Sequence, residues 1–229
     1  MKCKLASTIL LLFFLKASSG KAMSDTLERA PFYIKTNALE YIDIYTGSLY
    51  NVSAEIKLGK WFAINSEVGK YFSLPSKLRL FMNHKGFIVR EELKVYRNDR
   101  VSTMHNYCSL EFSYSEQEFN RTDSMDYDLD SISYSYDKYY HATRKFIGLQ
   151  FLFGGIQHFK HNLFLEVYGG LGLRFNTIKC DLPDHEAHGR YFGDWPVPSN
   201  YSMNEGYHVN LKFNFGVKLG FSIGNRKRV

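Results

Sequence analysis

The chain has few cysteines and, after its start, no long apolar run. Nothing beyond the first 20 residues approaches the roughly twenty apolar residues that a membrane-spanning helix requires. If the protein enters a membrane, it must therefore do so as a closed barrel, because lipid offers no partners for unpaired backbone groups. Of the three cysteines, Cys3 lies near the start, and Cys108 and Cys180 could form one disulfide in an oxidising compartment. The strand order below places these two apart, which predicts two unpaired thiols.

The positive charge of the chain is concentrated at its start. Four of the 29 basic residues lie in the first 22 positions, which hold no acid, so the rest has 25 basic against 23 acidic residues, a net charge of +2. Lys2 and Lys4 precede the apolar run Leu5 to Leu15, and small residues follow. This pattern predicts a secretory signal peptide over residues 1–22 and one domain over residues 23–229. The basic excess is thus mostly a targeting signal, and no nucleic-acid partner is predicted.

The segment Tyr207 to Ile223 has the clearest strand pattern, because apolar residues occupy every second position. Successive strand side chains face opposite sides of a sheet, so this strand has one apolar face and one face of polar and small residues. It is also long, since strands of soluble domains usually run about five to six residues and a tilted bilayer crossing needs roughly nine to eleven. The pattern predicts a membrane-spanning β-barrel.

Eight such segments predict an all-β fold, an eight-stranded antiparallel up-and-down barrel. They are Phe32 to Tyr41, Tyr50 to Leu58, Trp61 to Phe72, Gly86 to Tyr96, Met104 to Tyr114, Tyr139 to Phe153, Asn162 to Ile178 and Tyr207 to Ile223. Short and long connections alternate, as expected for periplasmic turns and extracellular loops. The short turns are Gly59-Lys60, Arg97 to Thr103 and Gly154 to His161; the long loops are Ile42 to Leu49, Ser73 to Lys85, Ser115 to Lys138 and Lys179 to Gly206.

The two faces of the predicted strands differ in chemistry. The apolar face would meet lipid and the charged face would line a narrow lumen, whereas a soluble barrel would reverse this arrangement. The predicted lumenal charge network is Glu55, Lys57, Glu67, Arg90, Glu92, Lys94, Glu111, Glu166, Arg174, Lys212 and Lys218. Acids and bases nearly balance, and an eight-stranded barrel is about wide enough for its own side chains, so this set is interpreted as a structural plug of paired charges.

Aromatic residues near strand ends predict two girdles at the membrane interfaces. The candidates are Tyr41, Trp61, Tyr71, Tyr96, Tyr114, Tyr139, Tyr140 and Tyr207. Three polar residues, Ser66, Glu91 and Asn106, alternate onto the proposed lipid face. A charge in the middle of a bilayer is costly, so Glu91 predicts either a bulge in the fourth strand or a position near an interface.

Four stretches resemble the small eight-stranded outer-membrane β-barrel family of Gram-negative bacteria, and in particular its uncharacterised "outer membrane protein beta-barrel" group. These stretches read YIKTNALEY, GFIVREELKVY, FLEVYGGLGLRF and VNLKFNFGVKLGF. The resemblance covers essentially the whole chain after residue 22. It implies insertion by the outer-membrane assembly machinery, contact with outer-membrane lipids and no assigned reaction.

The two longest predicted loops hold the candidate contact residues. Asp126, Asp128 and Asp130 have the spacing of a calcium loop, but Ser131 and Asp137 stand where Gly and Glu are expected, which favours a solvated acidic loop. In the last loop, Asp181, Asp184, His185 and His188 could gather around a transition metal. Exposed aromatics there make contact with a partner at least as plausible, so no metal or other cofactor is predicted. These aromatic candidates are Tyr191, Trp195 and Tyr201.

The sequence therefore predicts a non-enzymatic protein of the cell outer membrane, with a structural role or an extracellular partner bound through its loops. One alternative is an enzyme that modifies outer-leaflet lipid at the barrel rim, for which His141 is the one histidine at a credible rim position. A second alternative is a soluble secreted barrel that binds a small apolar ligand.

Overall fold

The computed structural model describes the strands and several of their connections. The described residues are 32–42, 48–59, 61–73, 82–97, 104–129, 132–181 and 206–223. The predicted signal peptide lies outside them. Helical structure in the described part is limited to the 3₁₀ turns η1 (Leu39–Ile42) and η2 (Lys160–Asn162), and no helix there is long and apolar enough to cross a membrane.

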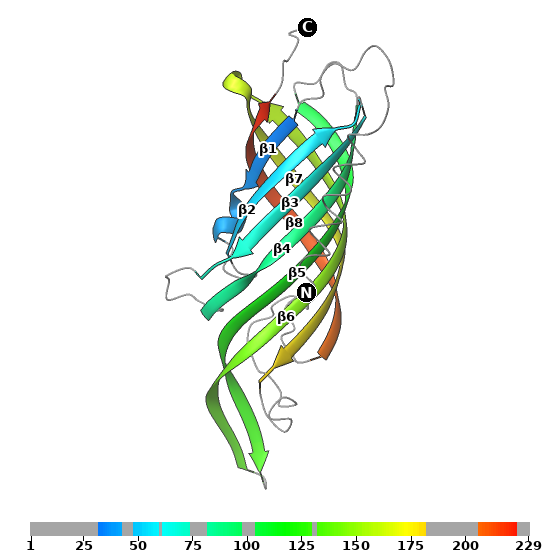
Figure 1. Ribbon diagram of the computed structural model, residues 1–229. Helices are drawn as coiled ribbons and strands as arrows, with labels where there is room; N and C mark the ends of the chain where they lie inside the picture. Colours follow the sequence, from blue (N-terminus) through cyan, green and yellow to red (C-terminus); the bar gives the residue numbers. More distant parts are fainter. Residues whose placement is uncertain are drawn as a thin grey trace, which may run out of the picture.

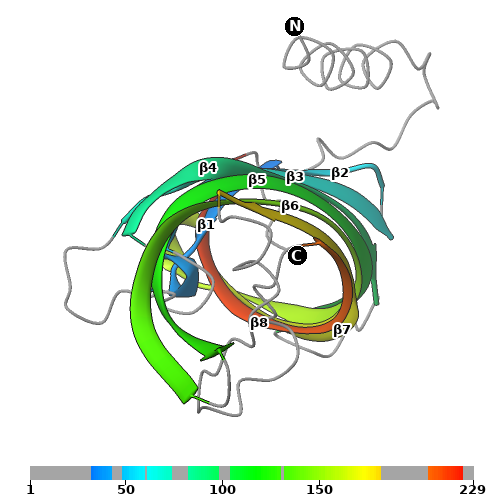
Figure 2. The same cartoon turned by 90° about the horizontal axis from the view of Figure 1, so that it is seen from below.

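Eight antiparallel strands form a closed barrel in chain order, as predicted (Figures 1 and 2). They are β1 (Phe32–Asn37), β2 (Leu49–Lys57), β3 (Phe62–Tyr71), β4 (Met82–Tyr96), β5 (Met104–Leu129), β6 (Ile132–His158), β7 (Leu163–Cys180) and β8 (Gly206–Ile223). Pairing of β1 with β8, from Phe32 opposite Ile223 to Asn37 opposite Lys218, closes the barrel. The end that carries Phe32 and Ile223 is called the inner end below, and the opposite end is the outer end.

Apolar side chains point outward, as the alternation predicts. Along β7 and β8, Leu171, Leu173 and Leu211 are about half exposed, while Glu166 and Lys218 on the other face are buried. The same holds on the other strands, with outward-facing Val52, Phe62, Val68, Leu110, Phe112, Ile147, Leu149 and Phe151. An exposed apolar belt around buried charges is the arrangement of a membrane barrel.

The strand bounds differ from the prediction mainly at β1, β5 and β6. β1 ends at Asn37, four residues early, because the chain turns into η1. β6 continues through Gly154 to His158, so the predicted turn from Gly154 is wrong and the connection to β7 begins at Phe159. Gly154 pairs with Tyr107, and a Cβ on it would lie 2.5 Å from the Tyr107 ring. Gly154 therefore lies within a strand, where its lack of a side chain leaves space for the Tyr107 ring in the lumen.

The predicted loop Ser115 to Lys138 is wrong, because it is a β-hairpin. β5 and β6 have 26 and 27 residues and pair continuously up to Leu129 opposite Ile132. Beyond Asn120, β5 no longer pairs with β4, and beyond Ala142, β6 no longer pairs with β7. The outer part of the hairpin thus extends past the barrel wall (Figure 1). Met125, Tyr127 and Leu129 alternate with Asp126 and Asp128, and Ile132, Tyr134 and Tyr136 alternate with Ser133 and Ser135, which is a strand pattern. The prediction of a loop gave more weight to the Asp- and Ser-rich composition than to this alternation.

The aromatic girdles are confirmed only in part. Trp61, Tyr139 and Tyr207 are exposed, but Tyr71, Tyr96 and Tyr140 are buried and point inward. Period-two alternation explains the error, because Tyr71 and Tyr96 are in phase with lumenal residues of their own strands. Other rings also lie on the outer surface: Tyr50 stacks on Phe72 with centroids 4.0 Å apart, and Phe87 lies 6.0 Å from Tyr114.

Glu91 lies on the outer face without a bulge at its position. The β4 register is continuous from Lys85 to Tyr96, and the irregularity lies between Met82 and Lys85. Glu91 stands opposite Ser66, whose hydroxyl donates a 2.6 Å hydrogen bond to its carboxylate. Glu91 and Ser66, two of the polar residues on the proposed lipid face, therefore hydrogen-bond to each other.

The two cysteines of the barrel are not joined. Cys108 lies in β5 near the inner end and Cys180 is the last residue of β7, and no disulfide connects them. This agrees with the prediction that Cys108 and Cys180 do not form a disulfide.

Candidate functional site in the barrel lumen

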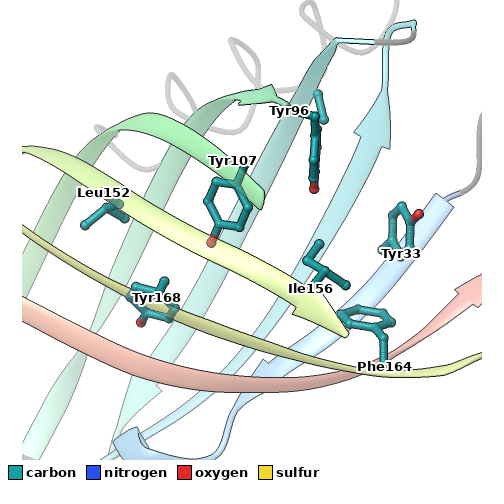
Figure 3. Close-up of a cluster of buried hydrophobic side chains, with 8 residues drawn as sticks. Tyr33, Tyr96, Tyr107, Leu152, Ile156, Phe164 and Tyr168 are labelled. Carbon is teal, nitrogen blue, oxygen red and sulfur yellow. The ribbon is translucent and has the colours of Figure 1, made fainter. Parts of the chain in front are cut away.

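The inner end of the lumen is filled by a cluster of buried apolar and aromatic side chains (Figure 3). Its members come from β1 and from β3 to β7: Tyr33, Ala63, Tyr96, Tyr107, Leu152, Ile156, Phe164 and Tyr168. The Tyr33 and Phe164 rings meet edge to face with centroids 5.2 Å apart, and Tyr96 lies 5.6 Å from Tyr107. Lys57, half-buried at this end, places its Nζ 4.6 Å from the Tyr96 ring centroid. The cluster closes the lumen at the inner end.

Next to this cluster lies a ring of four fully buried charges. Nζ of Lys35 is 2.6 Å from an oxygen of Glu55 and 2.6 Å from one of Glu166. Nζ of Lys94 lies 2.5 Å from Glu166 and 3.1 Å from Glu55. Two lysines and two glutamates thus cancel in charge. The hydroxyls of Tyr96 and Tyr107 donate to the same carboxylates, so the aromatic cluster is hydrogen-bonded to the charges.

A second charge cluster lies further out. Nη1 of Arg90 contacts Glu67 and is 2.7 Å from Glu40, and Nζ of Lys218 is 3.1 Å from Glu67 and 3.8 Å from Glu92. Glu40 comes from η1, which the sequence analysis took for strand and loop. Its other oxygen accepts a 2.5 Å hydrogen bond from Nδ2 of Asn51. The short β1 therefore lets the chain place an additional acid inside the barrel.

In the outer half of the lumen, charged side chains contact amide groups and an aromatic ring. Glu111 accepts a 2.9 Å hydrogen bond from Gln150, and the Arg174 guanidinium lies 4.4 Å from the Phe146 ring centroid. Arg144 donates to the amide oxygen of Gln117. Lys212, on β8, is half-buried. A second apolar cluster lies in this half, formed by Leu49, Tyr71, Ile88 and Phe146.

All eleven residues of the predicted lumenal network are therefore buried or half-buried. Three further ionic residues, Lys35, Glu40 and Arg144, were missed. Lys35 has the same alternation phase as Tyr33 and Asn37 and the opposite phase to Ile34. Its inward position could therefore have been read from β1 alone. The inward position of Arg144 could have been read from its phase, which is opposite to that of the outward-facing Ile147 and Leu149. Glu40 could not, because it follows the end of the strand.

The predicted contact residues of the hairpin lie at its far part. Asp126 and Asp128 are strand residues of β5, opposite Ser135 and Ser133. A calcium loop needs a curved backbone, so this paired strand does not fit the predicted spacing. Asp130 lies outside the described residues, as do Tyr191, Trp195 and Tyr201 of the last loop.

The metal and enzyme candidates can be placed only in part. Asp181 accepts a 2.7 Å hydrogen bond from the backbone of His141, while Asp184, His185 and His188 lie outside the described residues. Within the described ranges no three histidine, cysteine or acidic side chains group as metal ligands. Nδ1 of His141 is 2.9 Å from the amide oxygen of Asn120.

No protein-family model and no curated protein matches the chain. Among solved structures, it is similar to a major outer membrane protein from Thermus thermophilus, with 16% identity, a TM-score of 0.40, and coverage of 84% of this chain and 100% of that chain. At this identity and TM-score, the likeness does not bear on family or function.

Proposed function

We propose that the protein is an integral protein of the outer membrane, without enzymatic activity, whose barrel anchors the β5–β6 hairpin at the cell surface. One observation supports it above all: the faces of the barrel are inverted relative to a soluble protein. Leu171, Phe213 and Phe215 are 56%, 68% and 78% exposed, while Lys35, Glu55 and Glu166 are at most 2% exposed. Such an apolar belt would promote aggregation in water but is well solvated by acyl chains.

The filled lumen favours an anchoring role over transport. An eight-stranded barrel has an interior about wide enough for side chains. Here an aromatic cluster and paired charges occupy its inner half. The same arrangement speaks against a soluble carrier, because a carrier of an apolar ligand needs an apolar cavity.

The hairpin offers the surface for an extracellular partner. Past Asn120 and Ala142, each of its strands pairs only with the other among the described strands, so each has an edge that no described strand adjoins. Such edges can accept an extended segment of another protein as an added strand. The proposed surface role thus involves the hairpin together with the predicted aromatic contacts of the last loop.

Membrane insertion is tested by cell fractionation and by gel migration with and without heating. We expect the protein in the outer-membrane pellet, released only by detergent, with a folded form whose migration changes on boiling. Recovery in the soluble fraction without detergent would contradict the proposal. Protease added to intact cells should cut within residues 115–138, since the hairpin would face outward.

The absence of enzymatic activity needs a separate test. Mass spectrometry of outer-membrane lipid from cells with and without the gene should give the same lipid profile. A new or missing acyl or headgroup species in one of the two would instead support the lipid-modifying enzyme.

A further inference from the structure

Two lysines are neighbours on the outward face of the barrel, at the outer end of β3 and β4 (Figure 1). Lys70 stands opposite Phe87, and Lys85 lies two residues further out on β4, on the same face. Cα atoms of such diagonal neighbours are roughly 7–8 Å apart, within reach of long side chains. The backbone N–H of His84 donates a 2.6 Å hydrogen bond to Oγ of Ser73, so the two chain segments stay adjacent beyond Lys70. We call Lys70 and Lys85 the basic pair.

Neither lysine of the basic pair is paired within the described residues. Both side chains are exposed, and neither Nζ forms a hydrogen bond or an ion pair in that part of the chain. The sequence contains no aspartate or glutamate between Glu67 and Glu91. Like charges at neighbouring positions of a sheet repel each other. An anion that contacts both ammonium groups would remove this repulsion.

The outward-facing acids near the basic pair do not neutralise it. On β3, β4 and the part of β5 that pairs with β4, these acids are Glu91, Glu116 and Glu118. Glu91 lies further toward the inner end and accepts a hydrogen bond from Ser66. Glu116 is held by Nζ of Lys145 at 2.6 Å. Glu118 stands opposite Lys85 without forming an ion pair with it. One acid therefore stands beside two lysines.

The basic pair lies at the outer margin of the apolar belt. Toward the inner end, Val68 and Val89 follow on the same outward face and stand opposite each other. On the other side of Lys70 lies Tyr50, its partner in the β2–β3 ladder, which stacks on Phe72 with ring centroids 4.0 Å apart. Aromatic rings are enriched at the level of the lipid headgroups. In a bilayer, the basic pair would therefore lie in the headgroup layer.

We propose that the basic pair binds the phosphate headgroup of an anionic amphiphile in the outer leaflet, whose hydrocarbon chain runs inward along Val68 and Val89. This inference rests on the proposed membrane insertion with the hairpin at the cell surface. A phosphate monoester carries close to two negative charges and has acceptor oxygens for both ammonium groups. Its hydrocarbon chain solvates the apolar belt directly below the lysines.

The test is native mass spectrometry of the intact protein in a neutral detergent, titrated with dilauroyl phosphatidic acid. We expect one bound molecule. Binding should be about fivefold weaker for Lys70→Gln and for Lys85→Gln, and about 25-fold weaker for the double variant, the contribution of lysines near an acidic membrane surface. Lys70→Arg should retain binding.

Lys179→Gln is the matched control. Lys179 is an exposed lysine near the outer end of β7, also without a hydrogen bond or ion pair within the described residues, but three strands away from β4. The variant removes the same charge and should bind as the wild type does. An equal loss in Lys179→Gln would overturn the inference, because it would show general attraction by the net charge of the protein.

Three further results would overturn the inference. The first is equal binding by the wild type and the double variant. The second is equally tight binding of zwitterionic dilauroyl phosphatidylcholine or of inorganic phosphate. The third is a dimer without bound amphiphile, which would identify a second copy as the partner. Fractionation and heat-dependent migration of the double variant should match the wild type, so failure of this inference is distinguishable from failure of membrane insertion.

Discussion

The inner and outer halves of the barrel accommodate charged side chains in different ways. In the inner half, β1 completes the wall, and lysine and glutamate side chains pair in a ring from which solvent is excluded. In the outer half, β1 has ended and Lys212 is half-buried. Charge is buried in both halves, but the inner half pairs lysine with glutamate, whereas Glu111 and Arg144 of the outer half hydrogen-bond to glutamine amides.

Breaking the charge ring should have the largest effect. In Glu166→Ala, Lys35 and Lys94 lose a carboxylate that both contact. They then share Glu55, and Lys94 has a further, 3.8 Å contact with Glu92. Removing one partner of a buried pair leaves an uncompensated charge, so we expect a loss of about 3–5 kcal/mol in the free energy of unfolding. Urea unfolding in lipid vesicles, followed by tryptophan fluorescence, measures this loss. The exposed acid Glu116 is the control: Glu116→Ala should cost about 0–1 kcal/mol.

A charge on the lipid face should have the next largest effect, and its size should depend on depth. Leu149, in the middle of β6, is 48% exposed, and Leu149→Arg should cost about 2–4 kcal/mol of unfolding free energy. Val209 lies near the outer end of β8, so Val209→Arg should cost only about 0–1 kcal/mol. Both are measured by the same unfolding experiment. Equal losses at the two positions would show that the apolar belt does not lie in a membrane as proposed.

A substitution that adds a side chain should destabilise the barrel more on its lumenal face than on its outer face. Gly170 faces the lumen, and a Cβ there would overlap the carbonyl oxygen of Phe151. Gly170→Ala should therefore cost about 1–3 kcal/mol in stability. Its neighbour Gly169 faces outward, and a Cβ there would lie at an ordinary 3.7 Å from the carbonyl oxygen of Asn214, so Gly169→Ala should be nearly neutral. A larger loss for Gly169→Ala would contradict the assignment of the two faces.

Shortening the hairpin should have the smallest effect on the barrel. Past Asn120 and Ala142 it makes no strand pairs with β4 or β7, so its removal leaves the wall intact. Replacing residues 122–139 by an Asn-Gly turn, which suits a two-residue hairpin, should change stability by less than about 1 kcal/mol. Cleavage by protease at the cell surface should disappear. A destabilised barrel would show instead that the hairpin supports the wall.

Much of the barrel was predictable because lipid and lumen impose opposite preferences on successive residues. Glu166 and Lys218 could be assigned to the lumen from the apolar residues on either side of them. The hairpin strands were also predictable, since Met125, Tyr127 and Leu129 alternate with aspartates and Ile132, Tyr134 and Tyr136 alternate with serines, but the polar composition was taken to indicate a loop. Tyr71 and Tyr96 were misassigned because proximity to a strand end was given more weight than their alternation phase.

The sequence alone determined which face of each strand points out of the barrel, because a period of two residues specifies orientation wherever apolar and polar residues alternate. Only the tertiary structure decided which charges meet. Lys35 and Glu166 lie 131 residues apart and come together because the barrel closes between β1 and β8. It also decided where β1 ends, since that depends on the space available to η1 and Glu40 inside the closed wall.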